Sequence, residues 1–301
     1  MVLGDLMVDV VLIPDDGAIE RGTDVAGRVE IRQGGSAANT ARWLARLGAR
    51  TTLIAAIGRD AAGRALVEAL QADGVVPRVS RVAGARTGRI GVVAAGGERS
   101  FVADRGAADL LRPDDLRPGW FDRAALIHLP AYSLIGEPLG SAARQAISLA
   151  RAAGATVSLD LASIGPLLAR GRRAAVALVR EVRPDLILAT AAETEALLGG
   201  YRAERLLDFA PVAVVKRGAK GATVMALESA DRLRFEVATE RLVATDTTGA
   251  GDAFDAGFIV AWLSSREAGR SLPAALRRAA LAGHRAAARQ LTSGHPELPI
   301  V

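Results

Sequence analysis

Short apolar runs alternate with longer amphipathic stretches along nearly all of the 301-residue chain, and this alternation constrains the fold most. The apolar runs end at Gly, Pro or Asp, as buried strands do, whereas the longer stretches are rich in Ala and repeat apolar residues at helical spacing. A strand followed by a helix and another strand needs a crossover connection. The sequence therefore predicts an α/β fold with a mostly parallel central sheet flanked by helices.

Seven strands and seven helices are expected from this pattern. The predicted strands are 2–4, 52–57, 125–129, 156–159, 186–189, 212–216 and 222–226. The predicted helices are 37–47, 63–72, 140–153, 174–182, 194–198, 251–264 and 272–290. In such sheets a ligand binds beyond the carboxyl ends of the strands.

Two early stretches interrupt the alternation. Residues 10–33 hold short extended pieces with turns, and residues 87–104 resemble a hairpin that turns at Gly96 and Gly97. Together they predict a small antiparallel sheet outside the main one, with a face that should cover a ligand, a partner chain or both. Because no linker or internal repeat is found, residues 1–301 are expected to form one domain, with a lid made by about 10–33 and 87–104.

Composition excludes several classes of protein. The chain has no cysteine, which rules out disulfides, thiolate metal sites and cysteine catalysis. Its first apolar run lacks a basic flank and contains Asp5 and Asp9, and no uncharged apolar run is long enough to span a bilayer, so we expect a cytoplasmic protein without a membrane partner. The net charge is only +5 and the arginines are dispersed on helical faces, which favours solvated surfaces over a nucleic-acid partner.

The stretch VATDTTGAGDAFDAGF, residues 243–258, joins a strand-like segment to a helix. Gly249 and Gly251 allow the backbone to approach a ligand closely, and the first turn of the helix offers free N–H groups at the positive end of its dipole. These features predict an anion hole with Asp252 at its lip, where a carboxylate can accept a proton from a hydroxyl that attacks a phosphate. The alternative is a Gly-rich turn whose Asp stabilises the helix by about 0.5–1 kcal/mol.

A second glycine cluster, RQGGSAANTARWLARLG, spans residues 32–48. A helix is expected to begin near Ser36, which places Asn39 in its first turn, where the amide can donate to and accept from vicinal hydroxyls. Asp9, just beyond the first strand, suits a bidentate bond to sugar hydroxyls. The alternatives are a helix cap for Ser36 and a surface turn for Asp9.

Other motifs of phosphate and hydrolase chemistry are missing from the sequence. There is no Gly-x4-Gly-Lys-Ser/Thr loop, no protein-kinase signature, no complete nucleophile elbow and no dinucleotide fingerprint after the first strand. His128, His284 and His295 are isolated and show no metal-ligand spacing, which favours structural roles.

With these residues in view, the chain resembles the ribokinase family of sugar and nucleoside kinases, the PfkB carbohydrate kinases. Both family signatures are present, GGSAANTARWLARLGARTTLIAAIGRDAAG at 34–63 and DTTGAGDAFDAGF at 246–258, and the resemblance covers nearly the whole chain. It implies a Rossmann-like core with a β-sheet lid that often mediates dimerisation. It also implies ATP, Mg²⁺ and transfer of the γ-phosphoryl group to an alcohol, usually a primary hydroxyl.

The resemblance also assigns roles to individual residues. It makes Asp252 the catalytic base and the amides of Gly249, Ala250 and Gly251 the anion hole. The positions expected to bind the substrate hydroxyls are Asp9, Gly34, Gly35 and Asn39. The positions expected to contact the nucleotide are Lys216, Gly218, Gly221, Thr248 and His284. Asp246, with Thr248, matches part of a monovalent-cation site for K⁺ that would be completed near 293–294.

One departure from the family pattern concerns the metal. Many members carry Asn-x-x-Glu, but this chain reads LILATAAETEALLG. Without a gap, Thr190 replaces the Asn and Glu193 keeps the Glu; shifted by two, Ala192 and Glu195 take those places. In both alignments the Asn is missing, and Glu193 is the candidate for orienting a metal-bound water.

The acceptor is less constrained than the reaction. Asp104 and Arg105 match a region where relatives contact substrate, and Arg105 can bind a carboxylate, phosphate or hydroxyl. Phe101 is the only aromatic residue in the lid segments, which favours a sugar or sugar acid over a nucleoside base. A nucleoside kinase and a non-catalytic sugar- or nucleotide-binding relative are the alternatives, and a homodimer through the lid is expected.

Overall fold

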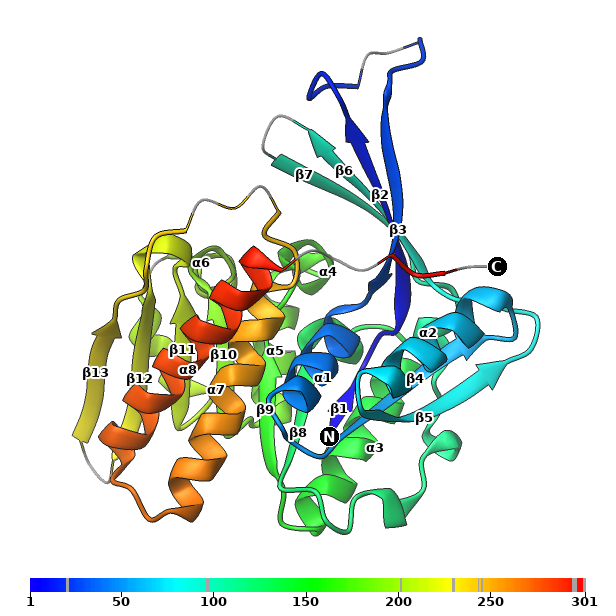
Figure 1. Ribbon diagram of the computed structural model, residues 1–301. Helices are drawn as coiled ribbons and strands as arrows, with labels where there is room; N and C mark the ends of the chain where they lie inside the picture. The colour runs from blue at the N-terminus through cyan, green and yellow to red at the C-terminus, as the bar shows by residue number, and fades with distance from the viewer. Residues whose placement is uncertain are drawn as a thin grey trace.

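The computed structural model describes residues 1–19, 22–95, 98–200, 202–228, 231–242, 244, 246–293 and 297–299. Its centre is a nine-stranded sheet in the order β13-β12-β11-β10-β9-β8-β1-β4-β5 (Figure 1). The strands are β1 Val2–Leu3, β4 Thr51–Gly58, β5 Val75–Val82, β8 Leu126–Pro130, β9 Thr156–Asp160, β10 Leu186–Thr190, β11 Val212–Lys216, β12 Ala222–Glu228 and β13 Asp231–Val237. All neighbours pair in parallel except β12, which is antiparallel to β11 and β13. The predicted α/β fold class is confirmed.

Helices bury both faces of this sheet. One face is covered by α1 Ser36–Arg46, α2 Ala61–Ala72, α7 Ala250–Glu267 and α8 Leu272–Thr292. The other is covered by α3 Leu139–Ala152, α4 Ile164–Leu168, α5 Arg172–Val182 and α6 Ala191–Leu198. In strand β4, Leu53 packs into the core on one face of the sheet and Ile54 into the core on the other. Because a central strand is buried on both faces, its residues on both sides are apolar.

The strands that the apolar-run pattern missed are β5 and β13. Both are edge strands, and their sequences, VVPRVSRV and DRLRFEV, alternate polar and apolar residues instead of forming an apolar run. An edge strand keeps one side near solvent, so its sequence does not have to be apolar at every position. None of the helices within the described residues is both long and apolar enough to cross a membrane.

The lid is a separate four-stranded sheet in the order β3-β2-β6-β7, and it projects from the main body (Figure 1). Its strands are β2 Met7–Pro14, β3 Gly27–Gly34, β6 Arg89–Ala95 and β7 Glu98–Asp104. Strands β6 and β7 pair antiparallel, as the hairpin expected at 87–104 requires, and β2 and β3 also pair antiparallel. The pairing of β2 with β6 is parallel, so the sheet is not purely antiparallel as predicted. The first strand starts at Met7, earlier than predicted; the predicted turn at Gly96 and Gly97 lies outside the described residues. Since β2 follows β1 after three residues, the lid rises directly from the carboxyl end of a central strand.

Candidate active site

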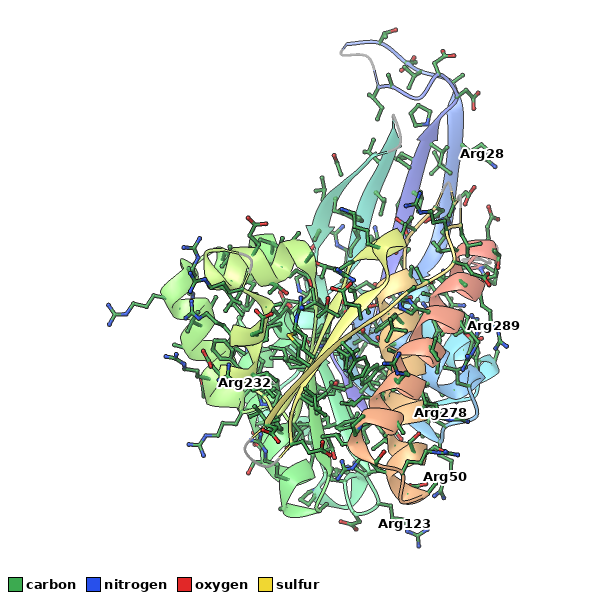
Figure 2. All side chains as sticks on the ribbon, turned by 90° about the vertical axis from the view of Figure 1, so that its left-hand side faces the viewer. Arg28, Arg50, Arg123, Arg232, Arg278 and Arg289 are labelled. Carbon is green, nitrogen blue, oxygen red and sulfur yellow. The ribbon has the colours of Figure 1, made fainter. Side chains whose placement is uncertain are left out.

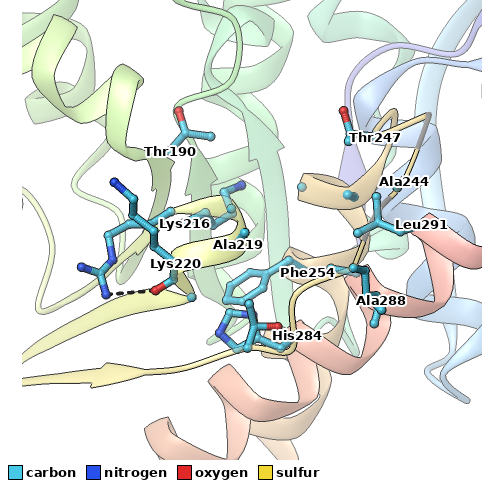
Figure 3. A pocket seen from close by; sticks show the side chains of 18 of the residues that line it. Thr190, Lys216, Ala219, Lys220, Ala244, Thr247, Phe254, His284, Ala288 and Leu291 are labelled. Atoms are coloured by element: carbon cyan, nitrogen blue, oxygen red, sulfur yellow. Dashed lines mark hydrogen bonds between the residues drawn. The ribbon is translucent and has the colours of Figure 1, made fainter. Parts of the chain in front are cut away.

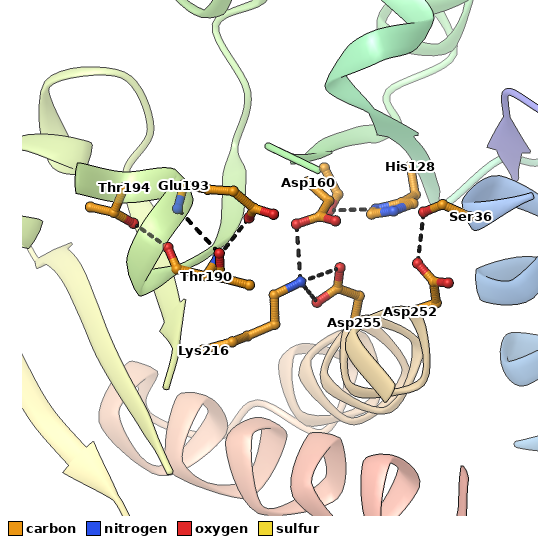
Figure 4. A network of polar contacts seen from close by, with 10 residues as sticks. Ser36, His128, Asp160, Thr190, Glu193, Thr194, Lys216, Asp252 and Asp255 are labelled. Atoms are coloured by element: carbon orange, nitrogen blue, oxygen red, sulfur yellow. Dashed lines mark hydrogen bonds and ion pairs between the residues drawn. The ribbon is translucent and has the colours of Figure 1, made fainter. Parts of the chain in front are cut away.

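Asp252 lies in the first turn of α7. The helix begins directly after Gly249, whose φ of +74° turns the chain into it. The Asp252 carboxylate accepts a hydrogen bond from Ser36 Oγ at 2.6 Å (Figure 4). It accepts a second from Asn39 Nδ2 at 2.9 Å. Both donors come from the first turn of α1, so the two signature glycine segments meet at one carboxylate. Sequence reasoning placed Ser36 only as a helix cap, and no sequence signal linked it to Asp252.

The environment of Asp252 suits a proton acceptor. Burial raises its pKa to about 7, while the hydrogen bonds from Ser36 and Asn39 act in the opposite direction. A carboxyl group with a pKa near neutrality is a much better base than an exposed aspartate.

Two backbone N–H groups at the start of α7 have no acceptor among the described residues. They belong to Gly249 and Gly251, whereas the N–H group of Ala250 donates to the Thr247 carbonyl at 3.3 Å. Two of the three predicted anion-hole amides are therefore available to a ligand, and the third makes a long turn bond. The helix dipole adds positive potential at the same point.

A buried ion cluster lies beneath this first turn (Figure 4). Lys216, at the end of β11, donates through Nζ to Asp160 at 3.0 Å and to Asp255 at 2.9 Å. A Cβ atom on Gly251 would lie 3.7 Å from the same nitrogen, which places the ammonium group next to the anion hole. Burial opposes the charge on Lys216, but the two carboxylates outweigh it and raise its pKa. Asp160 and Asp255 were missed from the sequence, because one ends an ordinary core strand and the other lies within a helix.

Glu193 forms a capping box with Thr190 at the start of α6. The Thr190 amide donates to Glu193 Oε2 at 2.7 Å, and the Glu193 amide donates to Thr190 Oγ1 at 3.2 Å. Burial and the nearby Asp160 raise the pKa of Glu193. Glu195 is exposed, so the geometry favours the alignment without a gap.

A cavity of about 880 Å³ opens beside the anion hole (Figure 3). Four of the predicted nucleotide positions line it, namely Lys216, Gly218, Gly221 and His284, and so do Ala250 and Gly251. The side chains of Phe254 and His284 pack edge to face there, with ring centroids 5.1 Å apart. Thr248 lines a smaller pocket instead.

That smaller pocket lies between the lid and α1 and is lined by Asp9, Asn39 and Gly249, among others. Asp9 Oδ1 is buried and has no hydrogen-bond partner, and burial together with Asp5 raises the pKa of Asp9 to about 7. A Cβ atom on Gly34 would overlap the Asp9 carboxylate, and one on Gly35, whose φ is +96°, would lie 2.6 Å from the Asp5 carbonyl oxygen. The glycine pair is thus needed to seat these two aspartates.

Asn39 is oriented by a buried arginine. Its Oδ1 accepts from Arg42, which directs Nδ2 toward Asp252. Most arginines extend into solvent, as those labelled in Figure 2 do. The interpretation of the arginines as solvated surface is nevertheless wrong for Arg42 and Arg32, which are 6% and 9% exposed. The sequence pattern around the arginines does not indicate which of them are buried.

The Arg105 side chain turns inward, toward Asp5 and Tyr132, whereas that of Asp104 is exposed. The Arg105 guanidinium stacks on Tyr132 with its Cζ 4.5 Å from the ring centroid, lies 3.7 Å from Asp5 and leaves a buried Nη2 without a partner. Its Nε also donates to Asp109 Oδ1 at 2.6 Å. Asp104 has a side chain 66% exposed beside Arg86.

Asp246 does not fit a K⁺ ligand. Its Oδ2 accepts from Arg32 Nη1 at 2.6 Å and its Oδ1 accepts from the Thr248 amide at 2.8 Å. Both carboxylate oxygens are engaged by protein donors, one of them already a cation. Of the segment expected to complete the site, Gly294 lies outside the described residues.

The nine-stranded sheet, the separate lid and a buried aspartate in the first turn of α7, next to residues that line two pockets, define a ribokinase-like α/β kinase. The model of the pfkB family carbohydrate kinases matches residues 1–297, and the chain belongs to this family.

Individual relatives agree with this assignment. The chain is 32% identical over 232 residues to "Probable fructokinase-3" from Arabidopsis thaliana, a match that covers 73% of this chain and 66% of that protein. It is 34% identical over 233 residues to "Fructokinase-1" from Oryza sativa subsp. japonica, with coverages of 73% and 71%. The crystal structure of adenosine kinase from Sinorhizobium meliloti superposes with a TM-score of 0.81 at 25% identity, covering 100% of this chain and 95% of that one.

Proposed function

We propose that this protein uses ATP to phosphorylate a hydroxyl, expected to be primary, of a small sugar or sugar acid. The observation that carries the proposal is the position of Asp252. It follows the open amides of Gly249 and Gly251, and its hydrogen-bond partner Asn39 lines the small pocket that contains Asp9. In this proposal the 880 Å³ cavity takes ATP, the small pocket takes the sugar, and residues 1–301 act as one domain with its lid.

The reaction needs mainly positioning and electrostatic stabilisation. The acceptor oxygen forms a bond to the γ-phosphorus, the bond from that phosphorus to the bridging oxygen of ADP breaks, and the hydroxyl proton passes to Asp252. The amides of Gly249 and Gly251, together with the Lys216 ammonium, stabilise charge on the phosphate oxygens. Asp9 accepts a hydrogen bond from a sugar hydroxyl, and the lid keeps water from the γ-phosphate.

Mg²⁺ fits two acidic residues that contact the lining of the large cavity, where Glu193 bonds to Thr190 and Asp160 bonds to Lys216. Asp160 and Glu193 offer carboxylate oxygens near Lys216, although no group of three metal-ligating side chains was found in the described part of the chain. This suits an ion that keeps several waters and is held by one or two carboxylates and the phosphates. When bound, Mg²⁺ would neutralise phosphate charge, with Glu193 orienting one of its waters.

Two acceptor classes compete for the small pocket. Identity above 30% to fructokinases favours a sugar, and the unpaired Arg105 Nη2 leaves room for a sugar acid. The likeness to an adenosine kinase favours a nucleoside. ADP release measured over a panel of sugars, sugar acids and nucleosides separates these classes. Sugar binding by calorimetry without turnover of any acceptor would instead indicate a non-catalytic binding protein.

Gly34→Ala should raise the KM for the acceptor at least about tenfold. The new Cβ overlaps the Asp9 carboxylate, so Asp9 must leave its position, and a hydrogen bond to a charged group contributes about 1.5–3 kcal/mol. Steady-state kinetics with varied acceptor measure the effect, while the KM for ATP should change little. Gly91→Ala is the matched control, since its Cβ would meet only ordinary contacts at 3.8 Å or more in the same lid. Equal KM values for both variants would remove Asp9 from the sugar site.

The rate should rise with pH through about 7 and then level off. A base must be unprotonated to act, and burial holds the pKa of Asp252 at about 7. Asp9 has a similar pKa, so the acidic limb of the kcat/KM profile can steepen where both groups titrate. Initial rates between pH 5 and 9, with a coupling system that is not limiting, check this prediction. A profile that is flat down to pH 5 would contradict it.

We further propose a homodimer through the outer face of the lid. Strand register places Val10, Leu12, Val29, Ile31, Val93 and Val102 on the face opposite Asp9. Val10 and Ile31 pack partly against the main core, whereas Val29 and Val102 are 63% and 75% exposed. An apolar sheet face of this kind is expected to be covered. Sedimentation velocity should show a dimer, and Val102→Asp should convert it to a monomer. Leu281→Asp, at an exposed apolar position on α8, is the control; a monomeric parent protein would refute the dimer.

A further inference from the structure

Arg32 connects the lid to the loop that leads into the anion hole. It lies on β3, and its guanidinium binds Glu30 through Nη2 at 2.6 Å and Asp246 through Nη1 at 2.6 Å. The Arg32 side chain is 11% exposed, and that of Asp246 is 28% exposed. Both ion pairs are therefore largely shielded from solvent, where they are stronger than surface pairs.

Arg32 lies between two functionally different places. In the pairing of β2 with β3, Arg32 is directly opposite Asp9, the carboxylate of the small pocket. Through Asp246 it also reaches the loop of the anion hole, because Asp246 Oδ1 accepts from the Thr248 amide, one residue before Gly249. The Thr248 carbonyl in turn accepts from Gln290 of α8 at 3.1 Å. The Arg32 guanidinium is thus linked both to the strand that carries Asp9 and to the loop that leads to Gly249.

We propose that Arg32 is a positioning residue that serves as a built-in cation at Asp246, and that this chain consequently works without bound K⁺. The inference rests on the proposed kinase function. The fixed charge holds the Asp246 carboxylate, which orders residues 246–249 so that the Gly249 and Gly251 amides point to the phosphate. Because Arg32 lies on β3 of the lid, its contact with Asp246 also couples the order of residues 246–249 to the position of the lid.

Kinetics in different salts test this directly. The parent enzyme should give the same kcat/KM in KCl as in choline chloride at equal ionic strength. Arg32→Met should lower kcat by up to about 10²-fold in choline chloride, the loss expected when reacting groups are misplaced, and added KCl should restore part of it. Arg28→Met is the control, because Arg28 also lies on β3 and contacts Glu30 only at 3.7 Å with a side chain 71% exposed. Strong activation of the parent enzyme by K⁺, or an Arg32→Met variant with the rates of the parent protein, would overturn the proposal.

A second readout does not depend on an acceptor. The melting temperature of the parent protein should be the same in KCl and choline chloride, whereas Arg32→Met should be stabilised specifically by K⁺ at the vacated carboxylate. If the panel of acceptors gives no turnover, the kinase proposal fails while this measurement still tests Arg32. If Arg32→Met does not fold, Arg32→Lys replaces it, with a smaller loss of kcat expected. K⁺-specific stabilisation of the parent protein would refute the inference.

Discussion

Asp252→Asn should lower kcat by about 10²–10⁴-fold, the usual contribution of a general base. Asparagine keeps the shape of the side chain and can still accept the hydrogen bond from Ser36, but it cannot take the proton of the acceptor hydroxyl. The affinity for ATP should be preserved, because the 880 Å³ cavity is lined by other residues. Single-turnover kinetics and ATP titration by calorimetry measure the two quantities separately.

Asp122→Asn is the matched control for this substitution, since Asp122 is an exposed aspartate outside both pockets. It should keep the turnover of the parent enzyme. If Asp252→Asn also retained near-normal turnover, Asp252 would not be the base, and Asp9, whose pKa is raised to a similar value, would become the next group to test.

Lys216→Met should reduce the free energy of unfolding by about 3–5 kcal/mol. The substitution leaves Asp160 and Asp255 buried without their cation, and removal of one partner of a buried ion pair is costly because the remaining charge stays desolvated. Burial already raises the pKa of Asp255 well above its usual value, so part of the loss would appear as proton uptake. Urea unfolding without nucleotide, at neutral pH, gives the magnitude.

The chain provides its own control for this prediction. Lys220 is the only other lysine and is exposed, so Lys220→Met should leave the unfolding free energy nearly unchanged. The double variant Lys216→Met/Asp255→Asn should be more stable than Lys216→Met alone, because one unpaired charge is removed. Equal stability of the two Lys216 variants would indicate that the loss comes from packing and not from charge.

The main sheet and its helices were predictable because their signals are local. Strands such as β10 and β11 are buried on both faces, so their sequences are apolar up to the last residue. Helix α7 begins directly after a glycine with positive φ. Edge strands β5 and β13 were missed because one side of each is near solvent and their sequences alternate polar and apolar residues. The parallel contact of β2 with β6 was also invisible, since nothing in either segment records which strand lies beside it.

Some residues of the candidate site could likewise be predicted from the sequence, and others could not. Asp252, Gly34, Asn39 and Lys216 were found because each lies in or beside a recognisable motif. Their partners were not: Ser36 and Asp252 are separated by 216 positions, and Arg32 and Asp246 by 214. Such pairs exist only once the sheet has brought α1, α7 and the lid together.

The sequence by itself determined the fold class, the family resemblance and the position of the glycine-rich turn before α7, because periodicity and glycine placement act over a few neighbouring residues. The tertiary structure alone decided which charges are buried and what they contact. Burial and proximity set the pKa of Asp252, gave Lys216 its two carboxylates and put Arg32 at Asp246, and these are properties of distance in space that no local pattern encodes.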